Sequence, residues 1–435
     1  MPSAKGHSIM TEVALSVLSE RMAAVWSKER EKLIREYCLY PDWFHASRSQ
    51  ELEKYMFFYQ NEKREFHYLP RETVIGNKKR CTAAFIFLLK KIALNLKKNE
   101  ISKAAKYAGV LAHFFEDSAG CQHSLEGPMG FNIPFGVPYP LVMQLFPAPV
   151  EKRYVPAQMI LSQLKEPELS ITGYKPLLLG ASPTEAAFHL YERYWDVLRT
   201  SRANVVRVIN GFYSDNNEEM NGALKVMLKE GARVIADSFY TAICLGKGYF
   251  ESEAVKKLQE VHLENLTPLY RPWYTPMPKV YGHNCLIKNC NLNENFQPVP
   301  LTLLMKKDKE STQVTFKNGL GTGGGFDFKK DQGFNYKIGY DIPRGIFSQF
   351  KVIAGLNALL KNEGRFNLQI HWNGEIAYST GVISGEELAN EAIVDVSKGG
   401  ILDLVFRKIG SGYPEVHVVW GNPALIRSRN APIWR

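Results

Sequence analysis

The sequence lacks a hydrophobic run long enough to cross a bilayer. Its most apolar stretch, residues 83–96, is interrupted by Lys90 and Lys91 and is shorter than the roughly 20 apolar residues that a transmembrane helix needs. The start of the chain also lacks the apolar core of a secretory signal peptide, because the charged Lys5 follows Met1 closely. We therefore expect a folded soluble chain that either is cytoplasmic or has lost a leader.

Cysteine is scarce, and its spacing carries little information. The six cysteines include no CxxC pair, which argues against a structural zinc ribbon, and their even number permits disulfides without requiring them. No segment repeats with a period of about 20–50 residues, which argues against a solenoid or a propeller. The glycine-rich run 319–325 lacks the Lys-Ser/Thr pair of a phosphate-binding loop, so we interpret it as a loop between strands.

The composition is that of a folded protein with more than one domain. At roughly 150 residues per domain, 435 residues suffice for two or three domains. Apolar residues make up 45% and charged residues 23%, which excludes a wholly disordered chain. The net charge of +10 is concentrated, since residues 61–106 hold 12 Lys or Arg against 4 Glu. This segment is either a solvated helix face or a contact for a polyanion such as nucleic acid or an anionic lipid surface.

Apolar residues recur at helical spacing through the first 265 residues. This periodicity predicts helices within residues 8–36, 50–60, 80–98, 101–116, 183–209 and 216–245. Between these helices, residues 124–181 are rich in Pro and Gly and predict a long irregular excursion over the helical body. We therefore expect an all-α domain over residues 1–265.

The pattern changes after about residue 270, where Asn and Gly separate alternating apolar and polar residues. Asn373-Gly374 joins two such segments and predicts a hairpin, because both turn positions favour a positive φ. Further strands are expected at residues 350–354, 392–396, 401–407 and 416–420. We expect a connecting segment with the first strands over 266–325 and an all-β domain over 326–435.

Histidines and carboxylates in the helical part have the spacing of metal ligands. His113 and Asp117 lie four residues apart on an expected helix and so share a face, and His123 follows six residues later. Zinc binds neutral imidazole nitrogens and carboxylate oxygens, so these three residues predict a metal site. The chain holds further candidates for the same cluster: His7, Asp42, His67, Glu185 and His189.

The order of these residues resembles the zinc-dependent phospholipase C and single-strand-specific nuclease superfamily. In that family a free amino-terminal residue and a Gly-His are followed by an Asp, a His-Tyr or His-Phe, a His-x-x-x-Asp with a third His, and a His with an acid four residues later. The resemblance covers residues 2–245, and its matches here are Gly6-His7, Asp42, His67-Tyr68, His113 to Asp117, and His123.

The sequence departs from the family pattern at two points. Arg193, not an acid, stands four residues after His189, so the acidic ligand there is Glu185 or Glu192. Pro2 stands at the place of the family's amino-terminal Trp.

The resemblance implies a hydrolase of phosphate esters, phospholipid or nucleic-acid phosphodiester, that holds two or three Zn²⁺ ions and is secreted or periplasmic. By resemblance, one ion would be held by His67, His113, Asp42 and Asp117, and a second by His123, His189 and a Glu. A third would be held by His7, the chain terminus and Asp117, which would therefore bridge. Such ions supply a metal-bound hydroxide and neutralise charge in the transition state, and Asp42 would orient or deprotonate the attacking water.

The C-terminal part is similar to the NPCBM type of carbohydrate-binding module, a β-sandwich with galactose-binding-like topology. The resemblance rests on residues 350–357, 366–378, 393–397, 401–404 and 416–423. It implies binding of a glycan, with packing against the helical body as the alternative, and Trp420 is expected in the core or on a sheet face.

The whole chain is thus expected to be a multidomain protein, an all-α helical zinc phosphoesterase domain followed by an all-β galactose-binding-like sandwich. The alternative is a non-catalytic surface-binding or scaffold protein that retains the fold. Metal content discriminates between the two.

Overall fold

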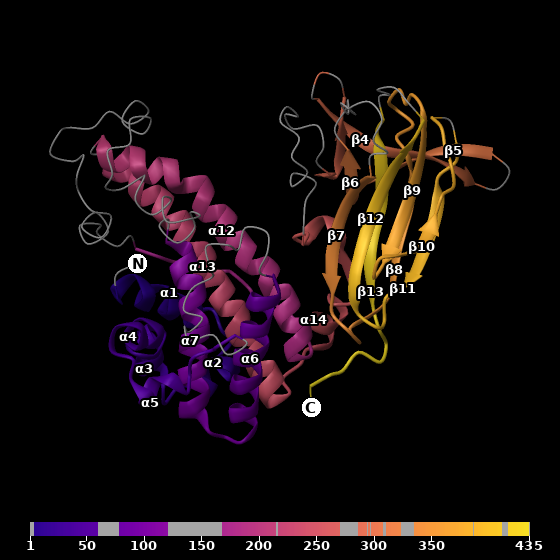
Figure 1. The fold of residues 1–435 in the computed structure, drawn as a ribbon. Coiled ribbons are helices and arrows are strands. Elements are labelled where there is room, and N and C mark those ends of the chain that lie inside the picture. Colours follow the sequence, from indigo (N-terminus) through magenta and orange to yellow (C-terminus); the bar gives the residue numbers. More distant parts are fainter. Residues whose placement is uncertain are drawn as a thin grey trace. The chain divides into compact units, whose positions relative to one another are not determined.

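The computed structural model describes two compact units. The first comprises residues 1–255 with 433–435, and the second comprises 256–432 (Figure 1). The residues whose structure is described are 4–59, 78–120, 168–214, 216–269, 286–293, 295, 297–307, 310–322, 335–385, 387–410 and 416–434. Among them, no helix is both long and apolar enough to span a membrane.

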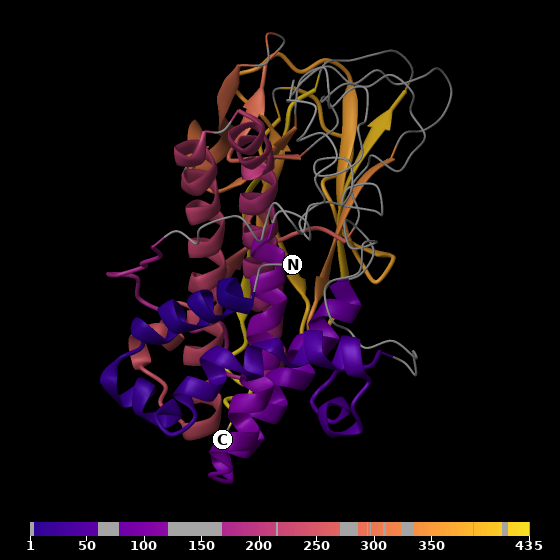
Figure 2. The same cartoon turned by 90° about the vertical axis from the view of Figure 1, so that its left-hand side faces the viewer.

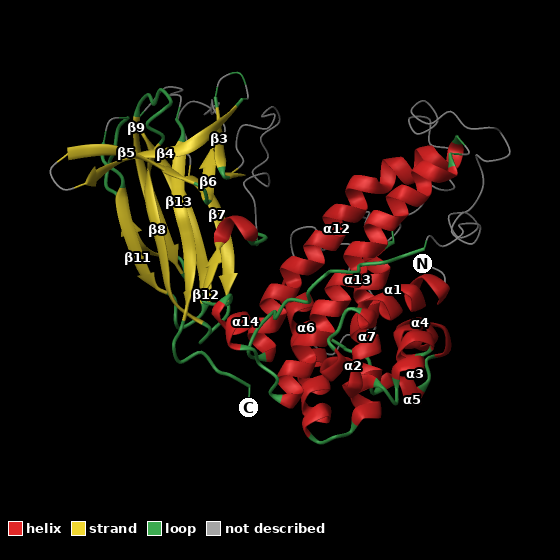
Figure 3. Cartoon of the chain, turned by 180° about the vertical axis from the view of Figure 1, so that it is seen from behind, coloured by secondary structure: helices red, strands yellow, loops and turns green. Residues whose placement is uncertain are grey.

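Helices form the regular structure of the first unit throughout its described part (Figure 3). Its long helices are α6 (Lys78–Lys97), α7 (Ile101–Ala119), α12 (Pro183–Tyr213) and α13 (Asn217–Lys247). These four helices pack against one another. Short elements precede them, indigo in Figure 2, and pack largely against α7 and α13. They are α1 (Ala4–Ser16), α2 (Glu20–Trp26), α3 (Arg30–Arg35), the 3₁₀ turn η1 (Tyr37–Leu39), α4 (Tyr40–Ser47) and α5 (Gln50–Glu53). The short helix α14 (Ser252–Lys256) lies at the boundary with the second unit.

The expected long helices are confirmed, but two of the predicted helical segments are wrong in extent. The run 8–36 is divided among α1, α2 and α3, with Ser19 in an extended conformation at the start of α2 and a turn after Trp26. α1 ends at Ser16 and α2 ends before Ser27, both without a Gly or Pro nearby, so the periodicity alone does not reveal these ends. The predicted helix 50–60 ends at Glu53, where Tyr55 and Met56 turn inward and are buried.

Helix α7 runs through the core of the helical unit. Every residue from Tyr107 to Ala119 is buried, so its polar residues must find partners inside the protein. At Gly109 the chain of η1 crosses so closely that an added Cβ would lie 2.4 Å from the Tyr37 carbonyl carbon. This close crossing brings the backbone after Tyr37 next to the side chains of α7.

The second unit is an antiparallel β-sandwich. One sheet has the order β11-β8-β13-β6-β2, with β1 also pairing with β13, and the other has the order β10-β9-β12-β7. The strands of the first sheet are β1 (Glu260–His262), β2 (Leu286–Lys288), β6 (Gly319–Thr322), β8 (Phe347–Leu356), β11 (Asn390–Asp395) and β13 (Val418–Arg427). Those of the second are β7 (Asn335–Ile342), β9 (Arg365–Trp372), β10 (Glu375–Ser379) and β12 (Gly400–Ile409). A further antiparallel group is β3 (Cys290–Leu292), β4 (Pro298–Lys307) and β5 (Glu310–Phe316), and a 3₁₀ turn, η4 (Leu263–Asn265), follows β1.

The alternation of the strands places one face of each sheet in the core. On β9, Phe366, Leu368 and Ile370 are fully buried, and the Asn373-Gly374 turn joins β9 to β10 as the sequence predicts. The strands expected at 350–354, 392–396, 401–407 and 416–420 are confirmed as β8, β11, β12 and the start of β13. Trp420 is 1% exposed, which confirms it as a core residue.

The glycine-rich run 319–325 is not wholly a loop, and that interpretation is wrong for its first part. Gly319–Thr322 forms β6, paired with β13 and β2. An added Cβ at Gly321 would lie 2.2 Å from the Cys290 carbonyl oxygen. Glycine is required here because another backbone passes against the strand, not because the chain turns.

The boundaries of the two units differ from the predicted 265 and 326. The second unit begins at Lys256 and includes the described strands of the predicted connecting segment 266–325. The last residues, 433–435, belong to the helical unit. There the Trp434 backbone N–H donates to the Ala181 carbonyl oxygen at 2.7 Å, and the Lys97 Nζ lies 4.7 Å from the centre of the Trp434 ring.

Candidate metal centre

His113 is oriented by the backbone of the neighbouring 3₁₀ turn. Its Nδ1 lies 2.7 Å from the Cys38 carbonyl oxygen. A carbonyl oxygen only accepts, so Nδ1 carries a proton, and Nε2 is the nitrogen left for a second proton or for a metal ion. The close crossing of η1 over α7 thus sets both the ring orientation and the tautomer of this imidazole.

His7 reaches the same place from α1. Its ring stacks parallel to that of His113, with centroids 4.6 Å apart and planes 4° from parallel. Its Nδ1 lies 2.9 Å from Oε2 of Glu116, and Oε1 of Glu116 accepts the Thr11 hydroxyl proton at 2.5 Å. Both imidazoles are therefore held by a partner at Nδ1, and their Nε2 atoms face the same pair of carboxylates.

Asp42 of α4 and Asp117 of α7 each direct one oxygen toward each imidazole. His7 Nε2 lies 3.8 Å from Asp42 Oδ2 and 3.7 Å from Asp117 Oδ1. His113 Nε2 lies 3.8 Å from Asp42 Oδ1 and 3.2 Å from Asp117 Oδ2. The four side chains thus form two parallel sets, each with one nitrogen and two oxygens from different carboxylates.

These separations fit a shared cation better than direct hydrogen bonding. Three of the four exceed the usual hydrogen-bond distance. Atoms bonded to zinc at about 2.0–2.2 Å in a tetrahedron lie roughly 3.3–3.6 Å apart, close to the values found here. The donor set of imidazole nitrogens and carboxylate oxygens is also one that zinc prefers. The residues present therefore fit a metal ion.

The electrostatics of the cluster favour a cation. The side chains of His7, His113, Asp117 and Glu116 are fully buried, whereas that of Asp42 is 18% exposed. Burial lowers the pKa of His113, but the neighbouring carboxylates, Asp117 foremost, outweigh this and raise it to about 9. Several carboxylates gathered in a buried site attract either protons or a metal dication, and Asp42 marks the side that water reaches.

The structure brings together four of the residues predicted as ligands: His7, Asp42, His113 and Asp117. His67 and His123, and the chain terminus, lie outside the described residues. The predicted second set, His123 with His189 and Glu185 or Glu192, therefore stays a prediction.

The acids of α12 have other contacts. Glu185 Oε2 accepts the Ala181 N–H at 2.8 Å, while the Ser182 hydroxyl accepts the Glu185 N–H at 3.2 Å, a reciprocal cap at the helix start. Glu192 Oε1 lies 3.5 Å from Lys78 Nζ, and both residues are buried. His189 contacts the ring of Phe188 edge-on, with centroids 5.2 Å apart.

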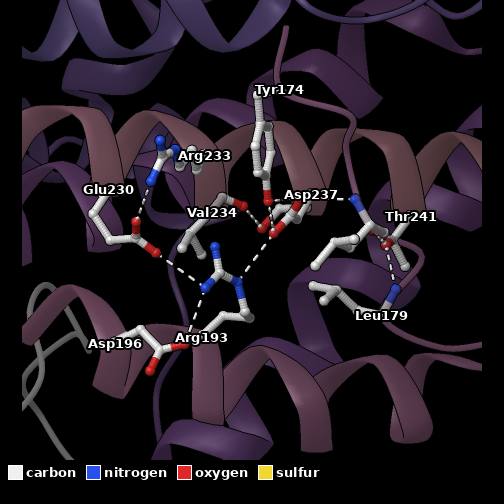
Figure 4. Close-up of polar contacts among 11 residues, drawn as sticks. Tyr174, Leu179, Arg193, Asp196, Glu230, Arg233, Val234, Asp237 and Thr241 are labelled. Atoms are coloured by element: carbon white, nitrogen blue, oxygen red, sulfur yellow. Dashed lines mark hydrogen bonds and ion pairs between the residues drawn. The ribbon is translucent and has the colours of Figure 1, made fainter. Parts of the chain in front are cut away.

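Arg193, which stands where the family pattern has an acid, belongs to a second polar cluster, built around the buried Asp237 (Figure 4). Its Nε lies 3.1 Å from Asp237 Oδ2, and its Nη1 lies 2.9 Å from Asp196 Oδ2 and 3.0 Å from Glu230 Oε1. Asp237 also accepts the Tyr174 hydroxyl proton at 2.8 Å and the Leu177 N–H at 2.8 Å. This network fixes the segment before α12 onto α12 and α13, so the departure at Arg193 has a structural role.

The sequence reasoning missed Glu116, Thr11 and the Cys38 carbonyl. Two of them had a signal in the sequence. Thr11 lies four residues after His7 on one helix, and Glu116 lies three residues after His113, so each shares a face with a predicted ligand. The Cys38 carbonyl is a backbone group, and no residue type could have pointed to it.

The strands of the second unit carry a family match. Residues 290–426 match the NPCBM/NEW2 domain. The match runs from the start of β3 to the penultimate residue of β13, so the expected NPCBM-like β-sandwich is confirmed for the second unit. No curated protein matches this chain.

The chain is also similar to several solved structures, at low identity. The CBM51 module of Clostridium perfringens GH95, in complex with methyl-galactose, is 16% identical with a TM-score of 0.29, and the alignment covers 38% of this chain and 99% of that module. The tandem CBM51 modules of the Streptococcus pneumoniae family 98 glycoside hydrolase Sp3GH98 are 16% identical with a TM-score of 0.31, covering 39% and 47%. The CBM51-2 and INT domains of Clostridium perfringens ZmpB, in complex with GlcNAc, are 18% identical with a TM-score of 0.28, covering 39% and 32%. The chain therefore spans less than half of these two multidomain structures.

Proposed function

We propose that the helical unit is a zinc-dependent hydrolase of phosphate esters. The observation that carries this proposal is the convergence of two oriented imidazoles on two carboxylates, each of which faces both Nε2 atoms. The order of these residues along the chain, which resembles the zinc phospholipase C and nuclease superfamily, supports a phospholipid or a nucleic-acid phosphodiester as substrate.

His7, Asp42, His113 and Asp117 would hold the metal, with His67, His123 and His189 as further expected ligands. Zinc, when bound, lowers the pKa of water and offsets the charge that grows on a phosphate in the transition state. Since Asp42 and Asp117 each face both imidazoles, each would serve two neighbouring ions, so their negative charge would keep two dications close together.

Asp42 is the residue best placed to act on water. It is the one partly exposed member of an otherwise buried cluster, so it lies on the side from which solvent and substrate would enter. From there it would orient the attacking water and accept its proton. His113 and His7 have Nδ1 engaged with a backbone carbonyl and with Glu116, which keeps the rings in place during the reaction. Exposed lysines along α6, Lys79, Lys90, Lys91 and Lys97, would favour an anionic substrate.

One experiment tests this function directly. We expect purified protein to contain two or three zinc ions per chain and to hydrolyse at least one of single-stranded DNA, phosphatidylcholine and a small chromogenic phosphodiester. Asp42→Asn should abolish turnover, whereas Asp395→Asn, at the end of a sandwich strand, should leave it unchanged. If the protein holds no zinc and cleaves none of these substrates, the alternative applies, and the fold serves as a non-catalytic surface-binding or scaffold protein.

For the sandwich we propose glycan binding, supported by the family match over residues 290–426. Galactose- and N-acetylglucosamine-terminated glycans are suitable probes for a glycan array followed by calorimetry. Binding that is unaffected by zinc removal is expected, because the metal ligands lie in the other unit. Absence of binding to any glycan would favour a purely structural sandwich. Glycan and lipid ligands would together agree with a secreted or periplasmic protein, which cell fractionation would test.

A further inference from the structure

Glu116 is a buried carboxylate at the metal centre for which the ligand pattern has no place. It lies on α7 directly before Asp117 and is fully buried. Its two oxygens have different partners, the His7 Nδ1 at 2.9 Å and the Thr11 hydroxyl at 2.5 Å. Burying a carboxylate is costly unless its charge and hydrogen-bonding capacity are used, so this residue needs an explanation.

The contacts argue against Glu116 as a direct metal ligand. Each of its oxygens accepts a hydrogen bond from a side chain of α1, and it lies on the Nδ1 side of His7. Asp42 and Asp117 lie on the opposite side of the ring, at Nε2. Glu116 therefore acts on the histidine and not on the position that the histidine faces.

We propose that Glu116, itself oriented by Thr11, is a positioning residue that prepares His7 for the metal, an inference that rests on the proposed metal centre. A carboxylate that accepts the Nδ1 proton fixes the tautomer, holds the ring in its orientation and makes Nε2 a stronger donor toward a metal. It also keeps the His7 ring stacked on that of His113.

The two histidines of the centre have different hydrogen-bond partners at Nδ1, so a change at Glu116 should affect only one of them. His113 donates its Nδ1 proton to a neutral backbone carbonyl, whereas His7 donates to a negative carboxylate. A charge-assisted hydrogen bond is about twice as strong as a neutral one. Loss of the Glu116 charge should therefore weaken the ion at His7 and leave the ion at His113 in place.

The test is zinc affinity of the full chain, measured by competition with a chelating indicator. Glu116→Gln keeps the size of the side chain, and we expect it to weaken one zinc equivalent by about 10–100-fold while the other equivalents keep wild-type affinity. Thr11→Val, which leaves Glu116 in place, should weaken the same equivalent by a smaller factor. Glu12→Gln, an exposed glutamate beside Thr11 on α1, is the matched control and should change nothing.

A second readout does not depend on turnover. In the zinc-loaded protein, the Nδ1 proton of His7 should resonate downfield in the NMR spectrum because it is bonded to a carboxylate. Glu116→Gln should shift this resonance upfield, while the Nδ1 proton of His113 should stay, since its partner is the Cys38 carbonyl.

The outcomes separate this inference from the function on which it rests. If wild-type protein binds zinc and Glu116→Gln retains wild-type affinity at every equivalent, or loses all equivalents alike, the positioning role is overturned and the metal centre stands. If Glu116→Gln fails to fold, wild-type zinc affinity in folded Thr11→Val would overturn it as well. A wild-type protein without zinc would instead overturn the proposed function.

Discussion

Each of the two units buries a cluster of polar side chains, but the clusters differ in charge and in whether their groups lie within hydrogen-bond distance of one another. In the sandwich, the Asn357 amide donates to the Asn291 side-chain oxygen and to the Pro300 carbonyl, both at 2.8 Å, and accepts the Leu359 N–H at 2.9 Å. Asn291 in turn donates to the Thr322 and Val418 carbonyl oxygens at 2.8 and 3.0 Å. These are neutral groups, and each donates to or accepts from another group of the same unit.

In the helical unit, the corresponding cluster is charged and its distances are longer. Asp42 and Asp117 face the two imidazoles at 3.2–3.8 Å, with every Nδ1 already engaged elsewhere. A neutral network at hydrogen-bond distance stabilises a fold by itself, whereas carboxylates spaced around a common point are suited to a cation from solution. The comparison teaches that the distances between polar atoms and their charge distinguish a structural polar cluster from a candidate metal site. Burial does not distinguish them.

The largest effect should come from removing the metal. Exhaustive chelation should lower the melting temperature of the helical unit strongly, because ligands from different helices couple metal binding to folding. An ion present at about 1,000 times its Kd stabilises the folded state by about 4 kcal/mol. The sandwich transition should stay in place. Differential scanning calorimetry with and without zinc measures both, and identical melting of the helical unit in the two conditions would falsify the metal centre.

Loss of one bridging charge should have the next largest effect. We expect Asp117→Asn to lose more than one zinc equivalent together with hydrolysis, because Asn keeps the size but not the charge that offsets two dications. Since Asp42 also faces both imidazoles, Asp42→Asn should lose more than one equivalent too. His123→Ala, predicted to serve a single ion, should lose about one. Elemental analysis of the purified variants decides, and full zinc content in Asp117→Asn would make it an ordinary buried acid.

A change in the neutral network should affect the sandwich alone. Asn357→Ala removes the partners of Asn291, Pro300 and Leu359 and should cost about 2–4 kcal/mol of unfolding free energy. Asn367→Ala, whose hydrogen bond to Ser379 is exposed, should cost about 0.5 kcal/mol or less. Zinc content should be unchanged in both. Zinc loss in Asn357→Ala would contradict the separation between the two clusters.

The smallest effect concerns the Arg193–Asp237 network (Figure 4). This network is charged, but its groups form ion pairs with one another at short distance. Burial raises the pKa of Asp237 from 3.8 to about 6, even though Arg193 beside it acts in the opposite direction. Between about pH 4 and pH 6 the folded state then binds a proton that the unfolded state has released, so this group makes stability fall as pH rises, by at most about 1.4 kcal/mol per pH unit. Other charged or titratable groups in this cluster are Tyr174, Asp196, Glu230 and Arg233.

Asp237→Asn should remove this slope. Urea unfolding of wild type and variant at intervals from pH 4 to 8 measures the difference in stability, which should vary between pH 4 and 6 and become constant above. A constant difference across the whole range would show that folding does not raise the pKa of Asp237.

Patterns repeated over many residues were predictable from the sequence. The long helices and the sandwich strands follow from apolar spacing, and the pairing of His113 with Asp117 follows from a four-residue interval on one helix. That His7 and Asp42 reach the same place depends on how separate helices pack, and only the family resemblance pointed to it.

The misinterpretations have local physical causes. Glycine permits a turn and so favours a loop at 319–325, but in β6 it permits a close backbone approach at Gly321. Glu185, one of the two acids predicted to ligate beside His189, also caps α12, as Ser182 three residues earlier indicates. Glu116 was missed because its partners, His7 and Thr11, lie more than 100 residues away in the sequence.

The return of residues 433–435 to the helical unit makes the sandwich an insertion within that unit. A single proteolytic cut near residue 256 would therefore leave both fragments associated as long as Trp434 stays bound to Ala181. Residues 433–435 act as an intramolecular ligand of the helical unit, and the connecting chain sets their effective concentration. A truncation that ends at 432 would remove that tether while leaving every strand of the sandwich in place.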